Sequence, residues 1–379
     1  MKHKIEWEDL PVFVKIYSYY TAGGASEHHA SLELNADFEK TVTQYRFLEE
    51  AVQRLEALFR KEGCQLVWKR FFVSDAVNHD VYLKKTYDEA LTVVQQPPLN
   101  RYKASTLLYF VENVQMFTNS DQSVVMKRPH FDHLFHTRLH ERIGDVSSQT
   151  RVIFDRYCNS LSLNGCSLEQ NCIRTWLFVQ HIDVQYTGMV SARRTLFERE
   201  GLTSKTHYIA STGIEGGYLY PEVQILMDAY AIANIQPEQI HYLYAPSHLN
   251  PTSEYGVTFE RGTAVDYGDR RHVFISGTAS INNRGEIVYP FDIEKQTART
   301  FENVQTLLAE ADANMEHVAH MIVYLRDTAD YTMVNHYISQ HYPDIPCIML
   351  WAPVCRPGWL VEVECMAIVP TVIQQFERF

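Results

Sequence analysis

The sequence predicts an α+β protein of two tandem domains, each a mixed β-sheet with helices on one face. The chain has 379 residues, more than one average hydrophobic core organises. Gln149-Thr150 recurs as Gln296-Thr297, an offset of 147 residues, which indicates an internal duplication. Strand and helix patterns follow one another in the same order in both copies, so the two domains share one fold.

The first helix of each copy is predicted from apolar residues at helical spacing. Phe154 and Leu161 of the upstream copy correspond to Phe301 and Leu308 of the downstream copy at the same offset. Such a stripe buries one face of a helix against a sheet. The downstream stripe consists of Phe301, Val304, Leu307, Leu308 and Ala311.

The elements after this helix are predicted in pairs, one from each copy. β-branched and aromatic residues indicate a strand at 320–325 and its counterpart at 175–179. A second helix is expected at 331–341, with a counterpart at 190–200. Each copy then ends in a strand, at 227–232 and at 363–368. The predicted order is strands, helix, strand, helix, strand.

These patterns divide the chain into four segments. Residues 1–62 are an N-terminal extension of unclear fold, and 63–233 form a degenerate copy of the domain. Residues 234–271 contain several prolines and glycines and are interpreted as a connector with an ordered part. Residues 272–379 form the second copy, which we expect to be catalytic.

The composition is that of an ordinary globular protein, with 46% hydrophobic and 21% charged residues. No apolar stretch approaches the ~20 residues of a membrane span, and the charged N-terminus predicts no secretory signal, so we expect a cytoplasmic protein without membrane partners. A net charge of −12 provides no electrostatic footprint for nucleic acid. The seven cysteines are odd in number and form no CxxC pair, which favours free thiols.

A set of motifs is spread through the second copy, namely Ile275-Ser-Gly-Thr-Ala279, Gly285-Glu-Ile-Val288, Gln296, Asn303, Tyr324-Leu-Arg-Asp327 and Val361-Glu-Val-Glu364. This set resembles the RidA (YjgF-like) family, which implies two Rid-type (chorismate-mutase-like) domains. Simple family members are homotrimers with sites between subunits, and they hydrolyse enamines and imines with an Arg and a Glu. Glu362 falls on that Glu, whereas Pro346-Cys347 stands where the Arg is expected and Leu226 replaces the Glu in the first copy.

A further resemblance includes the connector, through Asn250-Pro251, Tyr255-Gly256, Phe259-Glu-Arg261, Phe274-Ile-Ser-Gly-Thr-Ala-Ser-Ile281 and Cys355, seven residues before Glu362. This pattern is similar to the chorismatases, two-domain relatives of RidA that hydrolyse chorismate. The resemblance implies that Glu362 is the acid, that arginines hold the two carboxylates, and that Cys355 marks the branch making 3-hydroxybenzoate. Residues 282–290 depart from it, because they are RidA-like and lack the expected His-containing loop.

Glu362 is the predicted general acid. Along a strand alternate residues share a face, so Glu362 and Glu364 project to one side. If that side is dry, desolvation and mutual repulsion raise one pKa, and a protonated carboxyl becomes available near neutrality. Hydrolysis of an enol ether needs such a donor for its methylene carbon, after which pyruvate departs. The alternative is that both acids lie on a solvated edge or pair with arginines across a subunit contact.

Arginines are the predicted carboxylate ligands, because a planar guanidinium matches a carboxylate bidentately. Cys355 lies in a turn-rich segment that leads into the Glu362 strand, and either lines the site or is a buried small hydrophobe. Gly277 either permits close approach of a ligand or marks a bulge. The candidate substrate-binding residues are Arg261, Arg356, Arg326, Tyr255, Phe259, Gly277 and Ala279.

Metal and nucleotide cofactors are not expected. His133 and His136 lie in a histidine-rich stretch, but its spacing fits no strong motif such as HExxH. The glycines at 213–217 match neither GxGxxG nor a Walker sequence.

Three functions remain open. The first is a chorismatase-like hydrolase or lyase that releases pyruvate from chorismate or a similar cyclic dicarboxylate. The second is a RidA-like enamine or imine deaminase. The third is a non-catalytic Rid-fold binding or assembly protein. The expected partner is a small-molecule carboxylate. Monomer through homotrimer remain open, because two tandem copies can satisfy contacts that simple family members make between subunits.

Overall fold

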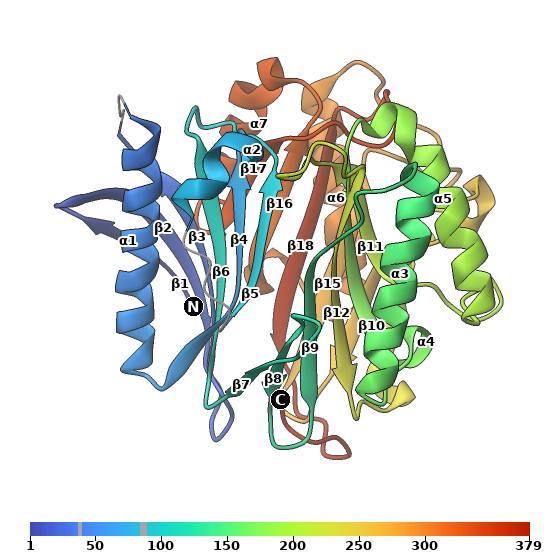
Figure 1. Ribbon diagram of the computed structural model, residues 1–379, viewed down its shortest axis with the longest axis horizontal. Coiled ribbons are helices and arrows are strands. Elements are labelled where there is room, and N and C mark those ends of the chain that lie inside the picture. Colours follow the sequence, from blue (N-terminus) through green and yellow to red (C-terminus); the bar gives the residue numbers. More distant parts are fainter. Residues whose placement is uncertain (37–39, 84–88) are drawn as a thin grey trace.

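The computed structural model describes residues 1–36, 40–83 and 89–379, and contains three six-stranded mixed sheets. We call the segments that build them unit 1 (2–112), unit 2 (115–233) and unit 3 (240–370). Helices α1, α3 and α5 lie on the outside of the molecule, and the sheets lie between them (Figure 1).

Unit 1 forms a complete sheet, so the predicted extension at 1–62 is wrong as a separate segment. Its first three strands pair with one another, and β3 pairs with β6, so a boundary at residue 62 would cut through this sheet. The elements are β1 (Lys2–Trp7), β2 (Leu10–Tyr19), β3 (Glu27–Leu34), α1 (Thr41–Arg60), β4 (Cys64–Val73), α2 (Ala76–His79), β5 (Ala90–Gln95) and β6 (Ala104–Glu112).

Unit 2 is the upstream copy that the 147-residue offset predicts. Its first helix begins after Asp145, whose carboxylate accepts a hydrogen bond from the Ser148 amide and caps the helix. The elements are β7 (Gln115–Thr118), β8 (Val124–Lys127), β9 (Asp132–His140), α3 (Val146–Leu163), α4 (Leu168–Asn171), β10 (Cys172–Val179), α5 (Ile182–Arg199), β11 (Ala210–Glu215) and β12 (Ile225–Ala233).

Unit 3 is the downstream copy, and its first helix starts 147 residues after that of unit 2. Asp292 caps this helix through the Lys295 amide. The predicted connector supplies two of its strands, β13 and β14. The elements are β13 (Ile240–Leu243), β14 (Gly262–Asp266), β15 (Arg270–Ala279), α6 (Ile293–Glu310), β16 (Val318–Leu325), α7 (Tyr331–His341), β17 (Cys347–Trp351) and β18 (Val361–Pro370).

The three sheets share one topology, so the prediction of two copies is not confirmed. Their strand orders are β1-β2-β3-β6-β4-β5, β7-β8-β9-β12-β10-β11 and β13-β14-β15-β18-β16-β17. In each sheet the last strand of the unit lies at an inner position, between its third and fourth strands. The α+β class with helices on one face of a mixed sheet is confirmed, in three units.

A glutamine at the fourth position of the first helix repeats in all three units. Gln44, Gln149 and Gln296 each accept a hydrogen bond from the backbone amide directly before the last strand, at 2.8, 2.8 and 3.0 Å. These amides belong to Lys103, Gln224 and Leu360. The recurring glutamine therefore fixes the entry to the central strand of each sheet.

The three units close into a ring. The edge strands β5, β11 and β17 contact the third strand of the next unit, which is β9, β15 and β3, respectively. The same contact repeated head to tail makes a closed ring with one pseudo-threefold axis. The ring that simple RidA proteins are expected to build from three chains is present here within one chain.

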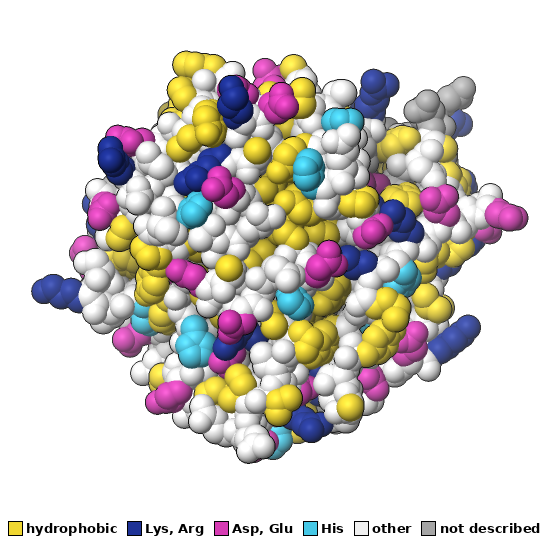
Figure 2. Space-filling model, turned by 180° about the vertical axis from the view of Figure 1, so that it is seen from behind, with side chains coloured by type: hydrophobic (Ala, Val, Ile, Leu, Met, Phe, Trp, Pro, Cys, Tyr) yellow, Lys and Arg dark blue, Asp and Glu magenta, His cyan; other side chains and the backbone are white. Residues whose placement is uncertain are grey.

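The outer surface carries charges of both signs. On the face behind the view of Figure 1, acidic and basic side chains are interspersed with hydrophobic ones (Figure 2). Across the described ranges, no helix is long and apolar enough to span a membrane. All seven cysteines are free.

Candidate active site

The candidate active site is a cavity between unit 2 and unit 3. It is narrow, with a volume of about 30 Å³. Unit 2 contributes helix α5 and strand β11, and unit 3 contributes β15, β18 and the loop between β17 and β18. The lining residues are Tyr186, Met189, Arg193, Ser211, Gly213, Phe259, Arg261, Gly277, Ala279, Ile281, Cys355, Arg356, Trp359 and Glu362.

Glu362 lies on β18 and is the acidic group among the described residues that line this cavity. Its side chain is 3% exposed and packs against the backbone of Gly277 on the neighbouring strand β15. Burial first, and then the nearby Glu364, raise the pKa of the Glu362 carboxyl to about 8, although Arg174 and Arg261 oppose the shift. At neutral pH this carboxyl is protonated and able to donate a proton.

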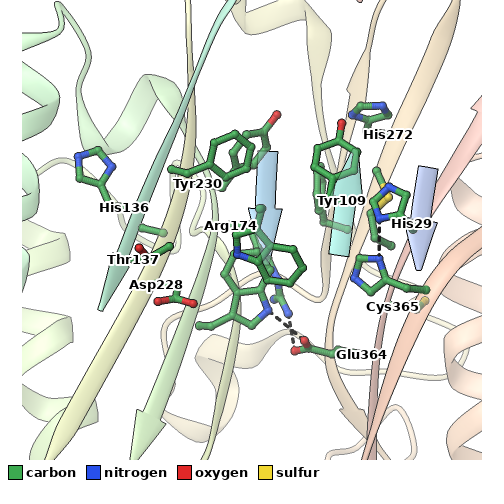
Figure 3. A pocket seen from close by; sticks show the side chains of 17 residues that line it. His29, Tyr109, His136, Thr137, Arg174, Asp228, Tyr230, His272, Glu364 and Cys365 are labelled. Atoms are coloured by element: carbon green, nitrogen blue, oxygen red, sulfur yellow. Dashed lines mark hydrogen bonds and ion pairs between the residues drawn. The ribbon is translucent and has the colours of Figure 1, made fainter. Parts of the chain in front are cut away.

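Glu364 is buried on the same side of β18, but its environment is different. Its two oxygens accept hydrogen bonds from Arg174, at 2.8 Å, and from the Trp176 indole, at 3.0 Å (Figure 3). Both donors come from β10 of unit 2, so this ion pair crosses the unit boundary. The two carboxylates thus divide into an ion-paired group and a protonated group.

Gly277 marks a bulge, which is one of its two predicted roles. The β15–β18 register shifts between Ile275 and Thr278, so Gly277 lies in a bulge. A Cβ atom on Gly277 would lie within 3.0 Å of both Oε1 and Cδ of Glu362, closer than real Cβ contacts. The glycine therefore permits the Glu362 carboxyl to approach the strand.

Gly277→Ala is expected to lower activity strongly while leaving the fold intact. The added methyl group displaces the Glu362 carboxyl, and misplacement of a reacting group by about 1 Å costs roughly 10²-fold in rate. Initial rates of the catalysed reaction, together with circular dichroism, measure the effect. Gly217→Ala is the control outside the cavity, because its Cβ would meet Gln95 at ordinary distances of 3.4 to 3.6 Å. Equal activity of both variants would contradict the placement of Glu362.

Two of the three predicted arginines lie in the cavity. Arg261 is buried and donates to the backbone and side-chain oxygens of Asn250, at 3.1 and 3.2 Å. Arg356 lies on the loop before β18, with its guanidinium 5.5 Å from the centroid of the Trp359 ring. Both residues line the same cavity as Glu362.

Arg326 is placed elsewhere, which corrects its prediction as a substrate ligand. Its guanidinium pairs with Asp183 of unit 2, at 2.6 and 3.0 Å, and also donates to the Val354 carbonyl at 2.7 Å. The charge is neutralised by a carboxylate of the protein. Arg326 instead holds the loop that carries Cys355 and Arg356.

Arg193 is a cavity residue that sequence reasoning missed. It projects from α5 of unit 2, is 2% exposed, and donates to the hydroxyls of Thr258 and Ser211 at 3.1 and 3.4 Å. Within the described ranges no carboxylate forms an ion pair with it. Burial lowers its pKa below the ordinary arginine value. A buried guanidinium that lacks an ion-pair partner is suited to an anionic ligand.

The remaining candidates divide into those that line the cavity and one that is not described. Phe259, Ala279 and Cys355 all line it. Burial first, and then Glu362, raise the pKa of the Cys355 thiol to about 12, so this cysteine is a neutral group rather than a thiolate nucleophile. The side chain of Tyr255 lies outside the described residues.

Strand register shows which unit carries the acid. Each of β4, β10 and β16 has a bulge near its start, and the fifth residue after it pairs with Ser105, Leu226 and Glu362, respectively. Equivalent positions thus hold a hydroxyl, an aliphatic group and a carboxyl. The acid belongs to the boundary between units 2 and 3.

Most of the histidine-rich stretch lies in strand β9. His133 bonds the Tyr230 hydroxyl at 2.7 Å, whereas His136 bonds the Ser160 hydroxyl of α3 at 2.6 Å. The two imidazoles therefore face opposite sides of the sheet. Among the residues that the structure describes, no group of three or more His, Cys, Asp or Glu is arranged to hold a metal ion.

Known proteins match part of the chain by sequence and most of the chain by fold. A family model described as Endoribonuclease L-PSP matches residues 262–369. A RutC family protein of Pyrococcus abyssi is 33% identical over 126 residues, which are 32% of this chain and 90% of that protein. The 3-aminoacrylate deaminase RutC of Acinetobacter baylyi is 25% identical over 101 residues, which are 26% of this chain and 79% of that protein.

A solved chorismatase superposes with a TM-score of 0.64 at 17% identity, over 80% of this chain and 92% of the other. At this identity the similarity shows a common fold. The match to the Pyrococcus abyssi protein covers nearly the whole of that relative at 33% identity. The chain therefore belongs to the RutC family, within the RidA (YjgF-like) superfamily.

Proposed function

We propose that this protein cleaves the enolpyruvyl ether of chorismate, or of a similar cyclic dicarboxylate, and releases pyruvate. One observation carries the proposal: the buried carboxyl of Glu362, whose pKa burial raises to about 8, shares a cavity with three arginines. An enol ether needs a proton donor, and a dicarboxylate needs cations. The shared fold with a chorismatase supports the same reaction class.

Glu362 is the proton donor in this reaction. Its proton passes to the methylene carbon of the enol ether, which leaves an oxocarbenium ion and an ionised Glu362. Water adds to the cation and returns a proton to Glu362, giving a hemiketal that collapses to pyruvate and the ring alcohol. The Cys355 thiol takes no covalent part, because its pKa of about 12 keeps it protonated.

The three arginines supply the binding charge. Two substrate carboxylates require at least two cations that converge, and a guanidinium binds a carboxylate through two parallel hydrogen bonds. Arg193 approaches from unit 2, whereas Arg261 and Arg356 approach from unit 3. A substrate held by both sets would lie across the unit boundary, beside Glu362.

The direct test is incubation of the purified protein with chorismate while pyruvate is followed. We expect pyruvate to accumulate in proportion to enzyme concentration. Absence of pyruvate at high enzyme concentration would contradict the proposal.

A second candidate is imine or enamine deamination, which the similarity to a 3-aminoacrylate deaminase favours. The same preparation should then hydrolyse imines derived from 2-aminoacrylate and leave chorismate intact. Running both substrates side by side separates the two functions.

The pH profile of chorismate cleavage is expected to have an upper limit near pH 8. Glu362 donates a proton only while protonated, so kcat/KM should be flat below its pKa of about 8 and fall tenfold per pH unit above it. Initial rates between pH 6 and 10 give the profile, and circular dichroism at each pH excludes unfolding. Activity that rises through pH 8 would instead make Glu362 a base.

Arg193→Met is expected to weaken substrate binding. Loss of one charge-assisted hydrogen-bonding group costs about 1.5–3 kcal/mol, or roughly 10–150-fold in kcat/KM, mainly through KM. Arg199→Met is the matched control on the same helix, because Arg199 is exposed and pairs with Asp155 and Glu200. An unchanged KM for chorismate in Arg193→Met would remove Arg193 from the binding site.

A further inference from the structure

A second cavity lies where the inner faces of the three sheets meet, and we call it the central chamber. Its volume is about 70 Å³, whereas protein interiors seldom leave voids larger than a water molecule. Residues from all three units surround this space (Figure 3). Glu362 does not line it, so the chamber is distinct from the candidate active site.

Aromatic side chains form most of its wall. The hydroxyls of Tyr109 and Tyr230 are engaged with Glu27 at 2.5 Å and with His133 at 2.7 Å. Because both hydroxyls are hydrogen-bonded to protein groups, the two rings present only apolar surface to the chamber. Aromatic rings attract other rings in stacked or edge-to-face geometry. The aromatic lining residues are Trp68, Tyr109, Phe135, Trp176, Tyr230 and Phe274.

The charged groups at the wall are balanced by protein partners. Arg174 pairs with Glu364 at 2.8 Å. Asp228 pairs with Arg70 at 2.7 Å and accepts the Thr92 hydroxyl at 2.6 Å. A charged guest would lose its hydration without gaining a counter-ion, so the wall favours a neutral guest.

A pair of neutral histidines provides the polar contact. His29 and His320 share a hydrogen bond between their Nδ1 atoms at 3.1 Å, and both rings line the chamber. Burial lowers the pKa of His320 to about 3 and that of His29 well below its ordinary value. One ring donates through Nδ1 and the other accepts, so a lone pair remains on one Nε2 and an N–H on the other.

We propose that the central chamber is a second ligand site, which takes a neutral aromatic ring bearing a hydroxyl group. The ring stacks on the aromatic wall, and its hydroxyl reaches the His29–His320 pair. A hydroxyl both donates and accepts, so it suits either arrangement of the shared hydrogen atom. The proposal is independent of the reaction at Glu362.

Titration calorimetry with 4-bromophenol tests this site in the full-length protein. We expect one saturable site, with weaker binding of bromobenzene, which lacks the hydroxyl. In crystals soaked with 4-bromophenol, the anomalous signal of bromine should lie in the central chamber. Absence of saturable binding, or bromine located only elsewhere, would overturn the proposal.

Two variants localise the binding. His320→Phe keeps a ring but removes the hydrogen bond. It should weaken the binding of 4-bromophenol about five- to tenfold and leave the affinity for bromobenzene nearly unchanged. Met366→Trp places a larger side chain on the chamber wall and should abolish binding of both probes. Unchanged affinity in Met366→Trp would also overturn the proposal.

Glu362→Gln separates this proposal from the proposed reaction. Glu362 lines the other cavity, so the variant should bind 4-bromophenol with wild-type affinity even if it no longer cleaves chorismate. If chorismate is not cleaved, the test of 4-bromophenol binding is unaffected. If 4-bromophenol does not bind, the test of chorismate cleavage is likewise unaffected.

Discussion

Glu362→Gln is expected to reduce pyruvate release from chorismate by about 10²–10⁴-fold, the usual contribution of a general acid. The amide has nearly the same size as the carboxyl, so it still fits against Gly277, but it has no acidic proton to transfer. Substrate binding depends on the arginines and should change little, so the loss should appear in kcat. Single-turnover kinetics at pH 7 separate the chemical step from binding.

Loss of stability cannot account for this effect, because the substitution removes an unfavourable group. The pKa of Glu362 is higher in the folded protein, about 8, than the value of 4.5 usual for a glutamate. The raised pKa of Glu362 therefore does not lower the free energy of unfolding below pH 4.5. It lowers this free energy increasingly between pH 4.5 and 8, and the full loss is present above pH 8. Glu362→Gln should thus unfold at a higher temperature than the wild type at pH 9.

The matched control is Glu294→Gln, in the exposed first turn of α6. It makes the same chemical change on the same unit, away from the cavity. We expect its kinetics to match the wild type. Wild-type turnover in Glu362→Gln would rule out proton donation by this residue.

Two of the three units could be predicted from the sequence, because units 2 and 3 repeat with one constant offset. Gln149 and Gln296 are the visible sign of that offset, and they perform the same task at the entry to the last strand. Gln44 performs it in unit 1 but lies 105 residues before Gln149, so a search at one spacing misses it. Unit 1 is recognisable as a third copy only from its strand pairing, in which β3 pairs with β6.

Arg193 was missed for a different reason. It lies in α5 between the buried residues Met189, Leu196 and Phe197, and an arginine within such a stripe is a usable signal. The motifs that indicate carboxylate ligands lie in unit 3, whereas the cavity also takes side chains from unit 2. Residues that meet only through assembly of two units share no spacing in the sequence.

The position where the RidA arginine is expected does not face Glu362, for the same reason. Pro346-Cys347 begins the edge strand of unit 3, which faces unit 1. The strand that faces Glu362 is β11, and strand register places Ser211 at the position equivalent to Cys347. Arg193 donates to that serine hydroxyl. A guanidinium is therefore present at this place, supplied by a helix rather than by the strand.

Arg174→Met is expected to cause the largest loss of stability, about 3–5 kcal/mol, because it leaves a buried carboxylate without its partner. Arg174 is 2% exposed and donates to Glu364, Thr212 and Ser276 at 2.8, 2.5 and 3.3 Å. It joins β10 and β11 of unit 2 to β15 and β18 of unit 3. Urea denaturation measures the loss, and Arg156→Met, which removes an exposed pair with Glu141, should cost at most about 1 kcal/mol.

The double variant Arg174→Met/Glu364→Gln identifies the cause of that loss. If the cost of Arg174→Met comes from an unpaired buried charge, removal of the second charge should restore most of the stability, since buried ion pairs are often replaceable by neutral groups. The side-chain amide introduced by Glu364→Gln would still accept the hydrogen bond that the Trp176 indole now donates to Glu364. Additive losses in the double variant would instead show that Arg174 stabilises the boundary through packing and its hydroxyl contacts. Either result measures how firmly unit 2 is fixed to unit 3, and the position of Arg193 opposite Glu362 depends on that attachment.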